Sequence, residues 1–168
     1  MRIGFALFAA IFLAAGCGAT IDVKGTLPAK QMKIAVLDFA DVAAYKAQRD
    51  YTLSGTSGEE HPDILMARAV RKALSQCPEY QVMSWVDMRR ALKRKNEVKP
   101  ASDRDAMVMA KKLGVEAVVI GEIEKYKQSW TLAFGWASVA FTARCLEVPG
   151  GKELWSARVS DWRSGAIE

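Results

Sequence analysis

Two acidic side chains at the end of an expected strand are the first candidates for chemistry in this sequence. Asp38 lies near the end of the apolar segment 33–40 and Asp41 directly follows it, where α/β folds place their active sites. Their spacing differs from the Asp-x-Asp pair of phosphoryl-transfer enzymes, and no further oxygen ligands for a metal ion are evident. Two interpretations follow: the acidic centre of a small hydrolase or nucleotide-binding enzyme, or carboxylates that solvate the end of a strand.

The residue types that most enzymes need are scarce here. His61 is the only histidine, which makes a histidine-based triad or a histidine-rich zinc site all but impossible. The segment 54–58, Ser-Gly-Thr-Ser-Gly, lacks the lysine of a P-loop and does not directly follow a strand. We therefore expect a protein that is not an enzyme, without catalytic residues and without a metal site.

The amino terminus has the pattern of a signal peptide. Arg2 is the only charged residue among the first sixteen, and residues 3–16 are all apolar or small. This run is too short for a transmembrane helix, which needs about 20 residues, but it suits a signal peptide. The small residues before Cys17 resemble a bacterial lipobox, which implies that residues 1–16 are removed and that Cys17 carries a diacylglycerol and an acyl chain. An ordinary signal peptide or a buried helix is the alternative, and no other cofactor is expected.

The residues around the lipobox also predict a location. Gly18 stands after Cys17, where an Asp would resemble a signal for retention in the inner membrane, so we expect an outer-membrane anchor facing the periplasm. Cys77 and Cys145 would then lie in an oxidising compartment, in which a disulfide persists. Two small buried hydrophobic residues are the alternative interpretation, and the sequence does not decide between them.

Composition is that of one ordinary globular domain. The chain has 168 residues, of which 51% are hydrophobic and 26% are charged, with a net charge of +5. This excludes a disordered chain and a membrane protein with several helical spans. After the signal peptide we expect a membrane tether at 17–32, a single domain at 33–163 and a tail at 164–168.

Hydrophobic periodicity predicts five strands and three helices. Strands are expected at 33–40, 80–85, 116–126, 130–148 and 153–162, and helices at 62–77, 87–95 and 102–113. The order β-α-β-α-α-β-β-β indicates an α/β (α+β) two-layer sandwich with a mixed sheet. A tight turn at 149–152 predicts a C-terminal β-hairpin.

Three motifs in this order carry a resemblance to a known group. Asp38-Phe39 ends the first strand, Leu113-Gly-Val-Glu116 precedes a strand that reaches Gly121, and 147–155 forms the hairpin. Together they resemble the periplasmic lipoproteins of the curli secretion (CsgG) type and the amino-terminal domain of TolB. The resemblance implies an α/β sandwich and a non-catalytic role in the cell envelope.

Five cations fall within seven residues of the second expected helix: Arg89, Arg90, Lys93, Arg94 and Lys95. They would cover the face opposite Met88 and Leu92. This pattern is typical of a solvated helix face. It would also suit contact with acidic lipid headgroups or with another anionic polymer of the envelope.

An uncharged segment runs from 128 to 143, and most of it belongs to the expected strand 130–148. Alternate positions hold the large apolar residues Trp130, Leu132, Phe134 and Trp136. A strand that is apolar on both faces can be a covered central strand, an interface with a protein partner or a second copy, or a membrane-spanning strand.

These observations favour a protein that acts by binding. We expect an outer-membrane lipoprotein that serves as a non-catalytic binding or assembly factor in envelope biogenesis or secretion. Its expected partners are the membrane, through the lipid on Cys17, and an envelope protein or a second copy, but not nucleic acid. The alternatives are a subunit of an oligomeric CsgG-type secretion complex, and a small hydrolase or nucleotide-binding enzyme at Asp38.

Overall fold

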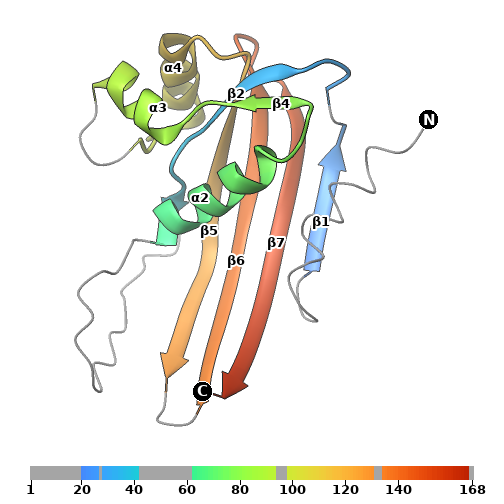
Figure 1. Cartoon of the computed structure of the whole chain (residues 1–168), viewed down its shortest axis with the longest axis vertical. Coiled ribbons are helices and arrows are strands. Elements are labelled where there is room, and N and C mark those ends of the chain that lie inside the picture. The colour runs from blue at the N-terminus through green and yellow to red at the C-terminus, as the bar shows by residue number, and fades with distance from the viewer. Residues whose placement is uncertain (1–19, 27, 42–61, 94–97, 131–133, 167–168) are drawn as a thin grey trace.

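A single mixed sheet forms the frame of the computed structural model, which describes residues 20–26, 28–41, 62–93, 98–130 and 134–166. The strands are β1 (Thr20–Gly25), β2 (Met32–Val36), β3 (Ala40–Asp41), β4 (Tyr80–Val82), β5 (Ala117–Trp130), β6 (Phe134–Glu147) and β7 (Glu153–Ala166). The described helices are α2 (Pro62–Leu74), α3 (Trp85–Leu92) and α4 (Asp103–Leu113). Six of the seven strands have the order β1-β7-β6-β5-β2-β4, and the seventh, β3, pairs with β5 (Figure 1).

The sheet has a parallel part and an antiparallel part. β2 runs parallel to β4 and β5, whereas β5, β6 and β7 form an antiparallel meander that β1 extends at the edge. These observations confirm the predicted α/β class, with its mixed sheet, three helices and C-terminal hairpin. The three long strands have 14 residues each, so they continue well beyond the helices at one end (Figure 1).

Helices cover both faces of the sheet around β2 because this strand is apolar on both sides. Ile34 and Val36 pack into a core with α2, and Ala35 and Leu37 pack into a second core with α3 and α4. Successive side chains of a strand point to opposite faces, so an uninterrupted apolar run must be covered twice. Each fully buried aliphatic side chain stabilises the fold by about 1.5–3 kcal/mol.

The helix ends follow local sequence rules. Ser102 caps α4 by accepting a hydrogen bond from the Asp105 amide, and Gly114 ends the helix with φ 62°, as the sequence predicts. α3 begins earlier than expected, at Trp85, because Ser84 accepts a hydrogen bond from the Asp87 amide. It ends at Leu92, since the following residue turns left-handed.

The predicted tether at 17–32 is wrong for its central part, because residues 20–25 form β1 at the edge of the sheet. Every residue of β1 pairs with β7, from Thr20 opposite Ser160 to Gly25 opposite Trp155. Ile21 and Val23 pack against the core on one face. This strand is short, and only two apolar residues alternate in it, so periodicity alone did not reveal it.

The expected strand 130–148 is also corrected. β5 continues to Trp130 and β6 begins at Phe134, so the uncharged segment belongs to two antiparallel strands. Trp130 lies opposite Gly135 in their register. The predicted tail at 164–168 likewise starts inside β7, which reaches Ala166. An apolar pattern without turn residues does not show where a strand ends, so the pairing of the strands decides it.

Phe39 and Gly121, two residues of the motifs quoted above, lie against each other in the core. A Cβ atom on Gly121 would lie 2.5 Å from carbons of the Phe39 ring. The ring of Phe39 is fully buried and also packs on the ring of Phe141, with centroids 5.7 Å apart. Glycine at position 121 therefore leaves the space that Phe39 occupies.

We predict that Gly121→Ala destabilises the protein by about 1–3 kcal/mol, because the added methyl group overlaps the Phe39 ring. Gly150→Ala is the matched control, since a Cβ there has nothing within 4 Å, and its effect should stay within about 0.5 kcal/mol. Urea unfolding of both variants measures the difference. Equal stability of the two variants would contradict the close contact.

Candidate functional site

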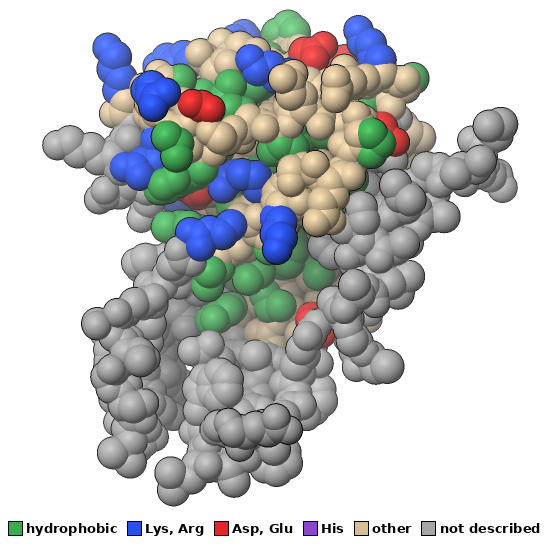
Figure 2. All heavy atoms as spheres, viewed as in Figure 1, with side chains coloured by type: hydrophobic (Ala, Val, Ile, Leu, Met, Phe, Trp, Pro, Cys, Tyr) green, Lys and Arg blue, Asp and Glu red, His purple; other side chains and the backbone are tan. Residues whose placement is uncertain are grey.

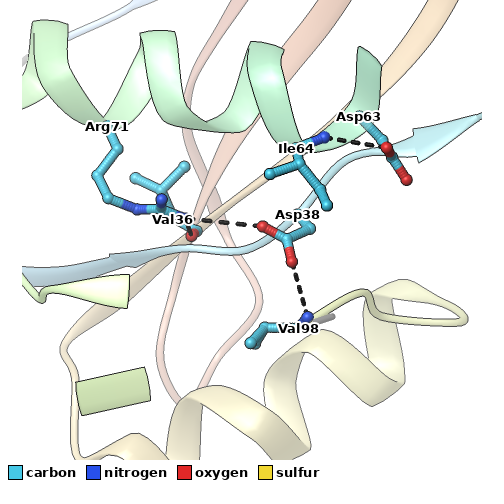
Figure 3. A network of polar contacts seen from close by, with 6 residues as sticks. All are labelled: Val36, Asp38, Asp63, Ile64, Arg71 and Val98. Carbon is cyan, nitrogen blue, oxygen red and sulfur yellow. Dashed lines mark hydrogen bonds and ion pairs between the residues drawn. The ribbon is translucent and has the colours of Figure 1, made fainter. Parts of the chain in front are cut away.

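The carboxylate of Asp38 is built into the fold just after β2. Its side chain is only 1% exposed, and its Oδ2 accepts a hydrogen bond of 2.7 Å from the Val98 amide. Its Oδ1 lies 3.8 Å from Nη2 of Arg71 on α2, which also donates to the Val36 carbonyl at 2.8 Å (Figure 3). Burial lowers the pKa of Arg71, and the nearby Asp38 charge acts in the opposite direction.

A second ion pair lies beside the first. Asp63, in the first turn of α2, accepts a hydrogen bond from the Ile64 amide, and its Oδ2 lies 3.1 Å from Nζ of Lys99. Figure 3 shows Asp38 between α2, which carries Asp63 and Arg71, and the segment that carries Val98. The two pairs therefore connect residues 98–99 to β2 and to α2.

This arrangement does not support the hydrolase alternative. Asp38 already binds a backbone amide and faces an arginine, so it has neither the exposure nor the partner of a general base. No group of three or more His, Cys, Asp or Glu in the described part of the chain could hold a metal ion. The side chain of Asp41, and all of His61, lie outside the described residues.

The structure contains Cys77 and Cys145 as buried free thiols. The structure therefore shows the alternative of two small buried residues, without a disulfide between them. Cys77 donates to the Ala73 carbonyl at 3.7 Å, and both cysteines belong to the core that contains Tyr80. Burial raises the pKa of Cys77 and raises that of Cys145 to about 12. Both thiols thus stay protonated at neutral pH, which makes them poor nucleophiles.

Three of the five cations of the predicted basic helix, Arg89, Arg90 and Lys93, lie in the described part of the chain. The Arg89 guanidinium lies over the Trp85 ring, 4.4 Å from its centroid, which holds this side chain against the protein. Arg90 is 78% exposed and makes only a surface pair with Asp87 at 3.4 Å. Lys93 is exposed at the end of α3. Arg94 and Lys95 lie outside the described residues.

Helix α4 extends this charged surface with residues that the sequence analysis did not single out. Lys111 and Lys112 are exposed in its last turn, and Arg104 is exposed in its first turn. Figure 2 shows Lys and Arg side chains gathered at the end of the molecule where the helices lie. The two exposed large hydrophobic residues of the described part, Val86 and Val108, also belong to α3 and α4. We call the exposed surface of α3 and α4 the basic end.

The four aromatic and aliphatic candidates are not on one strand. Trp130 ends β5, Phe134 begins β6, and Trp136 lies opposite Ser129 across the pair. Leu132 is outside the described residues. These strand ends form the end of the sheet farthest from α3 and α4 (Figure 1). The prediction of an interface at this segment stays a prediction.

Cys17, the predicted lipid site, precedes the first described residue. The first strand starts at Thr20, so only two residues stand between the cysteine and the sheet. No helix among the described residues is long and apolar enough to cross a membrane.

The fold is one that solved bacterial proteins share. The PelC dodecamer from Paraburkholderia phytofirmans has a TM-score of 0.54 at 16% identity, over 88% of this chain and 82% of that one. Lipoprotein GNA1162 from Neisseria meningitidis has a TM-score of 0.53 at 20% identity, over 80% and 83%. E. coli LpoB has a TM-score of 0.51 at 12% identity, over 94% and 65%. At these identities the likeness shows the fold alone.

Neither a family model nor a curated protein matches the chain. One of the solved structures of similar fold, GNA1162, is a bacterial lipoprotein. The finer resemblance to the CsgG and TolB groups stays a prediction.

We predict that Asp38→Asn destabilises the protein by about 3–5 kcal/mol, because it leaves the largely buried Arg71 charge without its counter-charge. Asp87→Asn breaks the exposed pair with Arg90 and is the control, with an expected effect of less than about 1 kcal/mol. Chemical unfolding at neutral pH measures both. A small effect at Asp38 would mean that the ion pair does not hold the strand end together.

Proposed function

We propose that this protein is a lipoprotein anchored in the outer membrane through Cys17, facing the periplasm, and that it acts by binding rather than by catalysis. The observation that carries the proposal is a lipobox followed, after two residues, by a domain whose fold resembles that of a solved lipoprotein. A covalently attached lipid anchors a protein without a spanning helix.

The contacts that Asp38 makes at the end of β2 support a non-catalytic role. Asp38, the best candidate for chemistry in the sequence, uses its carboxylate to join β2 to Val98 and Arg71. A carboxylate that is fully buried and paired in this way stabilises the fold and has no access to a substrate.

The basic end is the binding surface that we propose. Arg90, Lys93, Lys111 and Lys112 are exposed on two neighbouring helices, and Val86 and Val108 add apolar area between charged residues. Such a mixture of cations and apolar side chains suits an anionic partner, either an envelope polymer or an acidic protein surface. The role would be assembly or secretion at the outer membrane.

Self-association is the second candidate. It is favoured by one observation, that the PelC structure of similar fold is a dodecamer. A subunit of an oligomeric secretion complex of the CsgG type would be one form of this role, and the resemblance of the sequence motifs to that group supports it.

We predict that Cys17→Ser abolishes lipid attachment. The variant lacks the thiol that accepts the diacylglycerol, so it should accumulate as the uncleaved precursor and take up no labelled palmitate in growing bacteria. Cys77→Ser is the matched control, because that thiol is buried in the folded domain, and it should be labelled like the unchanged protein. Palmitate incorporation into Cys17→Ser would show that the lipid is elsewhere.

We predict that Arg90→Gln combined with Lys93→Gln weakens binding to a polyanion. The double variant should elute from a heparin column at a lower salt concentration than the unchanged protein. Each cation near an anionic surface contributes about 1 kcal/mol to the free energy of binding. Lys24→Gln with Lys125→Gln removes the same charge from exposed positions of β1 and β5 and is the control. If the control elutes as early as the test variant, net charge and not the basic end determines binding.

A further inference from the structure

The strands at the two ends of the sheet order, β1 and β4, each have an open edge. In the described part of the chain, β1 pairs with β7 alone and β4 pairs with β2 alone. β1 has six residues and β4 has three. An unpaired edge presents a row of backbone N–H and C=O groups to any strand that lies alongside it. β1 therefore offers the longer template for pairing with another chain.

Alternate residues of β1 direct their backbone groups toward the open edge. The amide of Thr26, directly after β1, donates to the Leu154 carbonyl at 3.3 Å. In an antiparallel pair, successive residues point their N–H and C=O groups alternately toward the partner strand and away from it. The even-numbered residues of β1 therefore face β7, and the odd-numbered Ile21, Val23 and Gly25 present their backbone groups outward.

The side chains of β1 divide between the two faces of the sheet. Ile21 and Val23 are half-buried and pack against the core with α2, whereas Asp22 and Lys24 are exposed on the opposite face. Neither Asp22 nor Lys24 forms an ion pair with another residue that the structure describes. One carboxylate and one ammonium group, two residues apart, thus remain available at this edge.

Only one register of two antiparallel β1 edges brings these charges together. Outward-facing residues must lie opposite each other for hydrogen bonds to form, which leaves every second register. A register with Asp22 opposite Asp22, or with Lys24 opposite Lys24, joins like charges and is destabilising. With Val23 opposite Val23, Asp22 of each copy lies opposite Lys24 of the other. These two residues then form a non-hydrogen-bonded pair, in which the side chains are closest.

We propose that two copies of this chain pair through the open edge of β1, antiparallel, about a two-fold axis that passes between the two Val23 residues. Val23 exchanges hydrogen bonds with Val23 of the second copy, and Ile21 does so with Gly25. The two Asp22–Lys24 pairs fix the register. The same patch serves both copies, as in other two-fold dimers, and the two sheets join into one.

The pairing rests on the proposed anchor, because an edge of six residues is a small interface. Three residue steps from Cys17 to Thr20 span at most about 10 Å, so a lipid on Cys17 holds β1 near the membrane. Confinement of two copies to one surface raises the effective concentration of each for the other. The two-fold axis is perpendicular to the sheet. With this axis along the membrane normal, both tethers start at the same height.

Val23→Cys tests the pairing, because residue 23 lies opposite its own copy. Opposite Cα atoms of a hydrogen-bonded pair are about 5.5 Å apart, which a disulfide can bridge. Membranes from bacteria that produce the full-length variant are oxidised in air with copper phenanthroline and analysed on a non-reducing gel. We expect a dimer band that the unchanged protein lacks, since Cys77 and Cys145 are buried and Cys17 is acylated in the proposed anchor.

Ile21→Cys is the matched control, because residue 21 is also half-buried on the same face of β1. In the proposed register its two copies are offset by four residues, about 13 Å, which is too far for a disulfide. Asp22→Lys, added to Val23→Cys, places a like charge opposite Lys24 and should remove most of the dimer band. Lys24→Asp, added to this variant, exchanges the two charges and should restore the band.

The outcomes separate the pairing from the proposed anchor. A dimer of Val23→Cys that is absent with Ile21→Cys, lost with Asp22→Lys and restored by the charge exchange supports the pairing. If Val23→Cys stays monomeric in the membrane fraction, if Ile21→Cys cross-links equally, or if the charge exchange restores nothing, the pairing is wrong and the anchor stands. If the protein is absent from the membrane fraction, the anchor itself is wrong, and the pairing with it.

Discussion

The pairing of β5 with β2 on one side and β6 on the other is the constraint on which the rest of the structure depends. The first residues of β5 are buried on both faces of the sheet. Ala117 and Val119 pack in the core with α2, and Val118 and Ile120 pack in the core with α3 and α4. The helical part and the antiparallel part are thus built on one strand. Because β5 has 14 residues and its helix-covered part is short, the remainder must project.

The polar groups near the end of β2 stabilise this arrangement instead of performing chemistry. Asp38 compensates the charge of Arg71 and binds the Val98 amide, while Asp63 holds Lys99. Both pairs join α2 to the segment that leads into α4, across the edge at which β2 ends. A buried carboxylate at the end of a strand therefore needs a check of its partners before it is assigned to catalysis.

The molecule is polarised along its strands, and this polarity relates the proposed functions to each other. Cations of α3 and α4 are exposed at one end, and the long strands β5, β6 and β7 extend beyond the helices at the other (Figure 1). A lipid on Cys17 would hold the start of β1 close to the membrane, because only two residues separate Cys17 from Thr20. Binding at the basic end and anchoring through Cys17 are then compatible in one protein.

By itself, the sequence determined the local features of this protein: the signal peptide pattern, the apolar strand of β2, the caps Ser102 and Gly114, and the mixed α/β class. These depend on neighbouring residues and on periodicity, which the chain displays directly. Only the tertiary structure decided that residues 20–25 extend the sheet, that Trp130 and Phe134 lie on different strands, and that Asp38 faces Arg71. These depend on pairing between distant segments, for which hydrogen bonds across strands and burial of charge set the outcome, and no local pattern encodes them.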